Sequence, residues 1–495
     1  MDSKAKKIGW LYAIAAIFIA ISLFLVVKKN SYLFYALPIV LCIMALYVFS
    51  LDKVLMLTSF CVPLSIVIDR FSDLGLAISL PSEPLLMGIL LVFTAKMLYD
   101  GQYDHRVTRH PISIVILCMF FWMLVTTITS ELPIVSLKFI ASRLWFIVPA
   151  FYICAILFKK PKNIDKFIWL YIAALCIVCV YTIVNHARNG FSGSSAHWVM
   201  TPFYNDHTAY GAALAIYLIL ALTYVFVPGV KRSRRYVIIG VVALLGLALF
   251  LSNCRAAWLS IIAAAGVLCC VLLKIKFRWI ATVAVALIGL FMVFQNQIID
   301  AMEKNKQDAS GDFMENVQSI TNISTDASNL ERINRWQSAF RLFEERPVFG
   351  WGPGTYQFVY APFQMSEEKT IISTNAGDGG NAHSEYFGPL AEQGLIGSLL
   401  VFALAITTVY CGLKTYKRCK NKKARVMVLG ATLAFISYAI HGGLNNFLDT
   451  DKLSIPVWSC AALIVAIDLF YAEKETFTEE EKQNHNNALR KKNRA

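Results

Sequence analysis

Apolar runs of membrane-spanning length recur along the whole chain and limit the folds that it can adopt. A spanning helix needs about 20 mainly apolar residues, and by this measure we count about fourteen spans. The 495 residues are 57% hydrophobic with a mean hydropathy of +0.57, which is too apolar for a soluble domain. The sequence therefore predicts an all-α polytopic membrane protein with about 12–14 transmembrane helices. The expected spans are Ile8–Val27, Tyr32–Ser50, Val54–Ile68, Leu85–Leu98, Ile112–Thr129, Leu137–Phe158, Phe167–Asn185, Thr208–Val227, Tyr236–Leu251, Ala256–Leu273, Ile280–Phe294, Tyr386–Leu413, Val426–Gly442 and Ile455–Tyr471.

One large polar segment divides the expected spans into two groups. Spans 1 to 11 lie within residues 1–294, and the polar segment follows at 295–385. Spans 12 to 14 lie within 386–472, and residues 473–495 form a polar tail. The fourth span, Leu85–Leu98, is short for a bilayer crossing. A loop as long as 295–385 is usually functional, so we expect the chemistry there.

The net charge of +14 is concentrated in short loops between the expected spans. Cytoplasmic loops of membrane proteins carry an excess of Lys and Arg. All five basic clusters fall on one side if the spans alternate from a cytoplasmic N-terminus, and an even number of crossings returns the C-terminus there. We therefore expect both termini in the cytoplasm, and the charge does not indicate a nucleic acid partner. The clusters are 4–7, 159–166, 231–235, 274–278 and 414–425.

The polar segment 295–385 has the opposite charge balance. It carries thirteen Asp or Glu residues and seven Lys or Arg residues, so it is net acidic in a basic protein. This composition fits a loop on the outer, periplasmic face. The apolar spacing from Leu330 to Phe343 indicates a helix within it, and this helix ends at Pro347.

The residues expected on the outer face suit group transfer from a diphosphate. His383 ends the polar segment just before a span, and an imidazole can take a proton from a hydroxyl. Arg255 stands in a tight turn between two spans, and Arg332 lies on the loop helix. A guanidinium offers paired donors to phosphate oxygens and stays charged. The alternative for His383 is an interfacial residue that only caps the next helix.

Four stretches resemble motifs of the O-antigen ligase and polymerase superfamily. Asn381–Gly397 resembles its Ala-His-Asn-x-x-Leu…Glu-x-Gly-x-x-Gly signature, although Ser384 replaces the usual Asn after the histidine. Arg255-Ala-Ala-Trp258 is similar to the hairpin motif of the family. Arg332–Gly354 is similar to its Arg…Trp…Pro-x-x-Gly-x-Gly-x-Gly loop, and Phe203–Gly211 to its Phe-x-Asn…Gly motif.

This resemblance implies a membrane glycosyltransferase of the C-type fold in the bacterial inner membrane, with a periplasmic active site. The donor would be a glycan on undecaprenyl diphosphate. A ligase would transfer it to lipid A–core, and a repeat-unit polymerase would transfer it to another lipid-linked glycan. By motif match His383 activates the acceptor, and Arg255 and Arg332 bind the diphosphate. Neither a cofactor nor a metal is needed if these arginines neutralise the leaving group.

Further polar residues on the expected outer face are candidates for substrate binding, each with a structural alternative. Glu385 orients the imidazole or caps the following helix, Asp206 caps its own helix, and Arg143 is an interfacial arginine. Asp449 and Asp451 suggest a solvated turn. The full set of substrate-binding candidates is Arg335, Arg341, Glu385, Asp206, His207 and Arg143, with His441, Asn445 and Asn446 as weaker ones.

A transporter or flippase is the alternative in a different functional class. Such a protein would place charged residues at the centres of spans and would break helices near the midplane of the bilayer. Here the charged residues gather at the outer ends of the spans, which favours an enzyme.

Overall fold

The computed structural model describes residues 19, 37–68, 78–101, 103–275, 327–366, 368–369, 373 and 380–473. Two expected spans, Ile8–Val27 apart from Ile19 and Ile280–Phe294, lie outside the described residues, as does the tail after residue 473. The first part of the polar segment, 295–326, also lies outside them.

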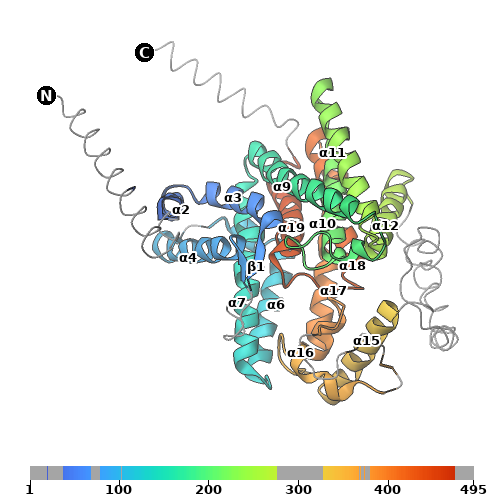
Figure 1. Ribbon diagram of the computed structural model, residues 1–495. Coiled ribbons are helices and arrows are strands. Elements are labelled where there is room, and N and C mark those ends of the chain that lie inside the picture. The colour runs from blue at the N-terminus through green and yellow to red at the C-terminus, as the bar shows by residue number, and fades with distance from the viewer. Residues whose placement is uncertain are drawn as a thin grey trace, which may run out of the picture.

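The described part of the chain is an all-α bundle, as predicted (Figure 1). Ten of its helices are long and apolar enough to cross a membrane, and each coincides with an expected span. Helix α7, the π-helix η3 and α8 form one of them, Pro133–Leu157. The helices are α2 Leu37–Phe49, α3 Leu51–Leu64, α4 Ser82–Asp100, α5 His105–Thr108, α6 Pro111–Ile128, α7 Pro133–Ile147, η3 Val148–Ile153, α8 Cys154–Leu157, α9 Pro161–Arg188, η4 Ser195–His197, α10 His207–Phe226, α11 Arg232–Leu251, α12 Arg255–Leu272, α15 Ala327–Glu345, α16 Tyr356–Val359, η6 Ala361–Phe363, α17 Phe387–Arg418, α18 Lys422–His441 and α19 Asp451–Phe470.

The second expected span, Tyr32–Ser50, is described only from Leu37, and the third, Val54–Ile68, is a helix that starts and ends earlier in the chain. Helices α2 and α3 have 13 and 14 residues and meet at Ser50. At 1.5 Å per residue α3 is about 20 Å long, whereas the hydrocarbon core is about 30 Å thick. Strand β1 (Ile66–Ile68) follows and pairs antiparallel with β2 (Ile78–Leu80), a ribbon that the sequence did not predict.

The fourth span is longer than predicted. Helix α4 begins at Ser82 and has 19 residues. Pro84 lies in its first turn, where a proline removes no intrahelical hydrogen bond. The proline therefore does not end the apolar run.

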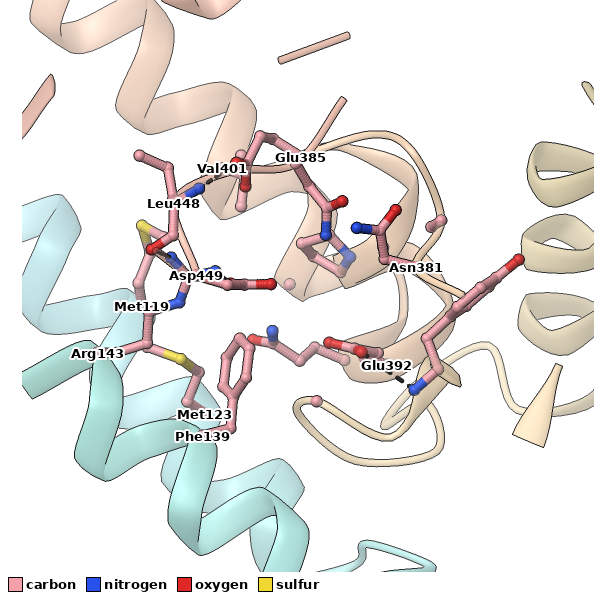
Figure 2. Close-up of a pocket in the computed structure, with 18 of the residues that line it drawn as sticks. Met119, Met123, Phe139, Arg143, Asn381, Glu385, Glu392, Val401, Leu448 and Asp449 are labelled. Atoms are coloured by element: carbon pink, nitrogen blue, oxygen red, sulfur yellow. Dashed lines mark hydrogen bonds and ion pairs between the residues drawn. The ribbon is translucent and has the colours of Figure 1, made fainter. Parts of the chain in front are cut away.

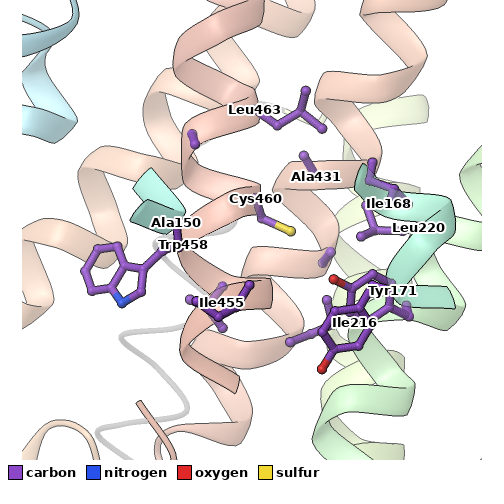
Figure 3. Packing of buried hydrophobic residues seen from close by; sticks show 14 of the residues in the cluster. Ala150, Ile168, Tyr171, Ile216, Leu220, Ala431, Ile455, Trp458, Cys460 and Leu463 are labelled. Carbon is purple, nitrogen blue, oxygen red and sulfur yellow. The ribbon is translucent and has the colours of Figure 1, made fainter. Parts of the chain in front are cut away.

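Helix α19 forms the centre of the bundle. Of its most apolar 18-residue window, 89% is buried, more than in any other described span. Figure 3 shows Ile455 and Cys460 on α19 facing side chains of the neighbouring helices. Tyr171 of α9 and Tyr217 of α10 stack with their ring centroids 4.0 Å apart beside it. Because α19 is enclosed, its packing fixes the positions of the surrounding helices, and the ends of these helices carry the candidate site described below.

The N-terminus of α19 is a buried ionic cluster rather than a solvated turn, so that interpretation of Asp451 was wrong. Asp451 is fully buried and accepts hydrogen bonds from the hydroxyls of Ser65 and Ser82. The ammonium of Lys452 donates to the carbonyls of Val62 at 2.6 Å and Ser65 at 2.7 Å. A buried charge needs such partners, because the interior does not solvate it.

We expect Lys452→Met to destabilise the protein by about 3–5 kcal/mol, because Asp451 then stays as a buried charge without a compensating cation. The thermal unfolding midpoint of the detergent-solubilised protein measures this. Lys231→Met, at an exposed position, is the matched control and should leave the midpoint unchanged. Equal midpoints for the two variants would contradict the role of Lys452.

Helix α17 contains a break that the sequence did not predict. Gly394 has φ 67° and ψ −166°, a conformation that non-glycine residues rarely adopt. The carbonyl of Val348 lies where a Cβ of Gly394 would stand, and the N–H of Leu395 donates to the carbonyl of Pro347 at 3.0 Å. The N–H of Gly352 donates to the carbonyl of Glu392 at 2.7 Å. The glycine-rich loop is thereby fixed against the start of α17.

Several helix ends meet at one end of the bundle. The hydroxyls of Ser260 on α12 and Ser437 on α18 are 2.9 Å apart. The N–H of Glu385, just before α17, donates to the carbonyl of Gly442, just after α18, at 2.7 Å. Cys254, at the start of α12, contacts the carbonyl of Thr208 on α10. Consequently, residues far apart in the sequence come together here.

Candidate active site

The backbone around His383 is held in an unusual conformation. His383 has φ 47°, in the left-handed region that costs energy for a residue with a Cβ. The side chain of Asn381 accepts a hydrogen bond from the N–H of His383 at 3.0 Å. The hydroxyl of Ser384 accepts from the N–H groups of Tyr386 and Phe387 and so caps α17. Residues on both sides of His383 therefore fix its position.

Glu385 connects this segment to α18 and to the turn that follows it. Its buried carboxylate accepts hydrogen bonds from the hydroxyl of Tyr438 at 2.6 Å and from the N–H groups of Phe447 and Leu448 at 2.9 Å. Among the described residues it bonds neither to the imidazole of His383 nor to an N–H group of α17. The hydrogen bonds of Glu385 therefore go to α18 and the following turn, and Ser384 provides the hydrogen bonds at the start of α17.

Arg255 and Arg332 are brought together from distant segments. Arg255 is the first residue of α12, whose N-terminus packs so closely on α10 that a Cβ at Gly211 would lie 2.6 Å from Cys254. Arg332 lies on α15 and donates from Nε to the carbonyl of Leu444 at 3.0 Å. Each guanidinium lies within the electrostatic reach of the other. Two cations within this range of each other are stabilised when an anion binds near them.

His383 lies beside Arg332. Burial first, and then the charges of Arg332 and Arg335, lower the pKa of His383 to about 4, against the opposing charges of Glu331 and Asp206. The imidazole is therefore neutral at pH 7 and can accept a proton. Its ring nitrogens form no hydrogen bond with the described residues, and the side chain is partly exposed.

Two further histidines belong to the same group. His207 lies within the electrostatic reach of Arg255 and Arg332, and its ring meets that of His197 at a centroid distance of 4.2 Å. His441 is buried, lies within reach of Arg332, and bonds through Nε2 to the side chain of Asn445 at 3.3 Å. We call Arg255, Arg332, His207, His383 and His441 the arginine–histidine cluster.

Asp206 stands next to this cluster as a helix cap. Its carboxylate accepts hydrogen bonds from the N–H groups of Thr208 at 2.7 Å and Ala209 at 2.8 Å, in the first turn of α10. This is the structural alternative considered for Asp206. Its charge still acts on His383.

Two of the arginines on α15 have other partners. Arg341 forms an ion pair with Glu368 and donates to the carbonyl of Phe363 at 2.7 Å. Nine residues separate it from Arg332, about 13 Å along the helix axis. Arg335 is buried, pairs with Glu331 at 2.6 Å and lies over the ring of Tyr360 at 4.0 Å. The structure thus does not bring Arg341 into the cluster.

A cavity of about 210 Å³ lies beside the 381–385 segment (Figure 2). Asn381, Ala382, Ser384 and Glu385 line it, but none of the five cluster residues does. Arg143 lies at this cavity, where it donates to the carbonyl of Leu448 at 2.7 Å and pairs with Asp449 at 2.5 Å. The candidate residues therefore divide between the cluster and the cavity.

Most of the residues that line the cavity have no signal in the sequence. Gln357, Tyr356 and Phe139 belong to segments whose proximity depends on the tertiary fold. Among the described residues, no three His, Cys, Asp or Glu side chains are placed to hold a metal ion.

The comparison with protein families identifies the part of the chain that carries the cluster. A model described as O-antigen ligase matches residues 240–402, from α11 to α17. This stretch contains Arg255, Arg332 and His383, whereas Phe203–Gly211 lies outside it. No curated protein matches the chain. The predicted resemblance is confirmed over residues 240–402 of this multi-pass membrane protein, where the chain matches the O-antigen ligase family model.

Proposed function

We propose that this protein is an O-antigen ligase that transfers a glycan from undecaprenyl diphosphate to a sugar hydroxyl of lipid A–core. The observation that supports this most strongly is the convergence of Arg255, Arg332 and His383 at one end of a membrane bundle. Two cations and a neutral imidazole suit a reaction that releases a diphosphate and consumes a hydroxyl. The family match supports this class of reaction.

The proposed reaction is one displacement at the anomeric carbon of the donor glycan. His383 takes the proton of the acceptor hydroxyl as its oxygen forms a bond to that carbon. The bond from the carbon to the phosphate oxygen breaks, and undecaprenyl diphosphate leaves with the electron pair. Arg255 and Arg332, instead of a metal ion, stabilise the charge that develops on the diphosphate.

The proposed location is the periplasmic face of the bacterial inner membrane, with both termini in the cytoplasm. Two of the basic clusters, 159–166 and 414–425, lie at the helix ends opposite to the cluster. Lys and Arg in short loops mark the cytoplasmic side. The arginine–histidine cluster would then face the periplasm, where lipid-linked glycans are assembled into the outer envelope.

A deletion of the gene tests the proposed function directly. Lipopolysaccharide from the deletion strain is separated on a gel, and lipid-linked glycan is extracted in parallel. If the protein is a ligase, we expect the deletion strain to contain bare lipid A–core together with accumulated polymer on undecaprenyl diphosphate. Core that carries one repeat unit would assign the chain to the second candidate, a repeat-unit polymerase. Unchanged lipopolysaccharide would refute both.

The pKa of His383 predicts an unusual pH profile. Since burial and the arginines lower this pKa to about 4, His383 remains a base down to that pH. We expect kcat/KM, which reports the free enzyme, to stay level from pH 7 to about 5 and to fall near pH 4. The bound diphosphate is negative and raises the pKa, so kcat should fall at a higher pH. A kcat/KM that falls at about pH 6.5, the ordinary histidine value, would contradict this.

A further inference from the structure

We propose that the cavity beside the 381–385 segment binds the acceptor, and that the group it takes is an uncharged sugar ring. This inference depends on the proposed function, because it assigns the second substrate of that reaction. It assigns the two substrates to two different sites near His383. The diphosphate binds at the arginines, and the acceptor sugar binds in the cavity.

The position of the cavity supports this assignment. Ala382 and Ser384 both line it, and the Cα of His383 lies between theirs, about 3.8 Å from each. Asn381, which lines the cavity, also binds the N–H of His383. A sugar that fills the cavity therefore lies beside the backbone of His383, although the imidazole does not itself line the cavity.

The charges around the cavity exclude an anionic group. Arg143 is the only Lys or Arg among the described residues that line it, and its guanidinium already bonds to Asp449 and to the carbonyl of Leu448. The guanidinium also lies 4.8 Å from the ring centroid of Phe139. Glu385 and Glu392 add two carboxyl groups. Apart from Arg143, no Lys or Arg among the described lining residues could bind a phosphate or an acidic sugar here.

The chemistry of the walls fits a sugar. Carboxyl and amide side chains such as Glu392, Gln357 and Asn381 can bond to hydroxyls, and the aromatic rings of Phe139 and Trp458 can pack against the C–H face of a sugar. Figure 2 labels Glu392, Asn381 and Phe139 at the cavity. A lipid tail would not need these polar groups. A volume of about 210 Å³ is below the range of about 300–1,000 Å³ for drug-sized ligands, which suits a single ring.

A variant that fills the cavity tests this inference. Gln357 is partly exposed and lines the cavity, so Gln357→Trp should occupy the space. Gln337→Trp, at a partly exposed position on α15 that does not line it, is the matched control. The proteins are reconstituted in vesicles with the lipid-linked glycan and with lipid A–core, both purified from the deletion strain. KM is measured for each substrate, and binding of undecaprenyl diphosphate shows that each variant is folded.

We expect Gln357→Trp to raise the KM for lipid A–core at least about tenfold, which corresponds to about 1.4 kcal/mol. Its KM for the donor and its binding of undecaprenyl diphosphate should match the wild type, as should all three values for Gln337→Trp. An active wild type whose Gln357→Trp variant keeps its acceptor KM would refute the acceptor site alone. A wild type that transfers nothing to either acceptor, lipid A–core or lipid-linked glycan, would refute the proposed function first.

Discussion

Replacing His383 with alanine is expected to abolish detectable glycan transfer while the protein remains in the membrane. A positioned general base contributes about 10²–10⁴ in rate, and the acceptor hydroxyl would keep its proton without one. The position itself is at a loop outside the core, so we expect little loss of folding. Transfer is measured in cells that lack the wild-type protein, and kcat in reconstituted vesicles.

The control for this variant is His105→Ala, an exposed histidine before α6 at the opposite end of the bundle. It should transfer glycan at the wild-type rate. His383→Ala should still bind undecaprenyl diphosphate, since the arginines are intact. Wild-type transfer by His383→Ala would remove His383 from the reaction.

The second large effect is expected for Arg255→Lys, which keeps the charge but loses the paired donors. A lysine is a point charge and cannot bind a diphosphate through two parallel N–H bonds. Loss of one preorganised donor to the developing charge typically costs about 10²–10³ in kcat. We therefore expect kcat/KM for the donor to fall at least about a hundredfold, with weaker binding of undecaprenyl diphosphate.

Arg188→Lys is the control, since Arg188 is exposed in the last turn of α9 at the same end of the bundle. The two large effects are distinct, because only Arg255→Lys should lose affinity for the diphosphate. If Arg255→Lys kept its activity, the diphosphate would have to bind at Arg332 and its neighbours.

The spans could be predicted because membrane helices leave a long apolar signal that needs no tertiary information. Ten described helices coincide with expected spans for this reason. The third expected span differs because α3 begins at Leu51 and ends at Leu64, before strand β1. Three-residue strands such as β1 are too short to leave a pattern in the sequence.

The cluster could be predicted in part from motifs, and helix geometry could have refined it. An α-helix turns about 100° per residue, so Arg341 points about 180° away from Arg332, whereas Arg335 lies only about 60° from it. This rotation explains why Arg341 pairs with Glu368 instead. The opposite orientations of Arg332 and Arg341 could therefore have been predicted from the sequence, once the helix itself was predicted.

Other roles depend on partners that only the folded chain brings close. Asp451 is buried because Ser65 and Ser82, more than 350 residues earlier, supply its hydrogen bonds. Glu385 accepts a hydrogen bond from the N–H of Phe447, in the turn after α18, rather than from the helix that it precedes. Likewise, the cavity joins α6, α7 and α17 with the 446–449 turn, so no local pattern indicates it.

The central claim is that the arginines and His383 transfer a glycan from a lipid diphosphate to a hydroxyl. The most direct measurement uses the purified protein in vesicles with the lipid-linked glycan and lipid A–core. We predict a covalent glycan–lipid A–core product, with one undecaprenyl diphosphate released for each glycan transferred. An intact donor that only changes its side of the membrane, with no glycosidic bond formed, would contradict the account and indicate a flippase.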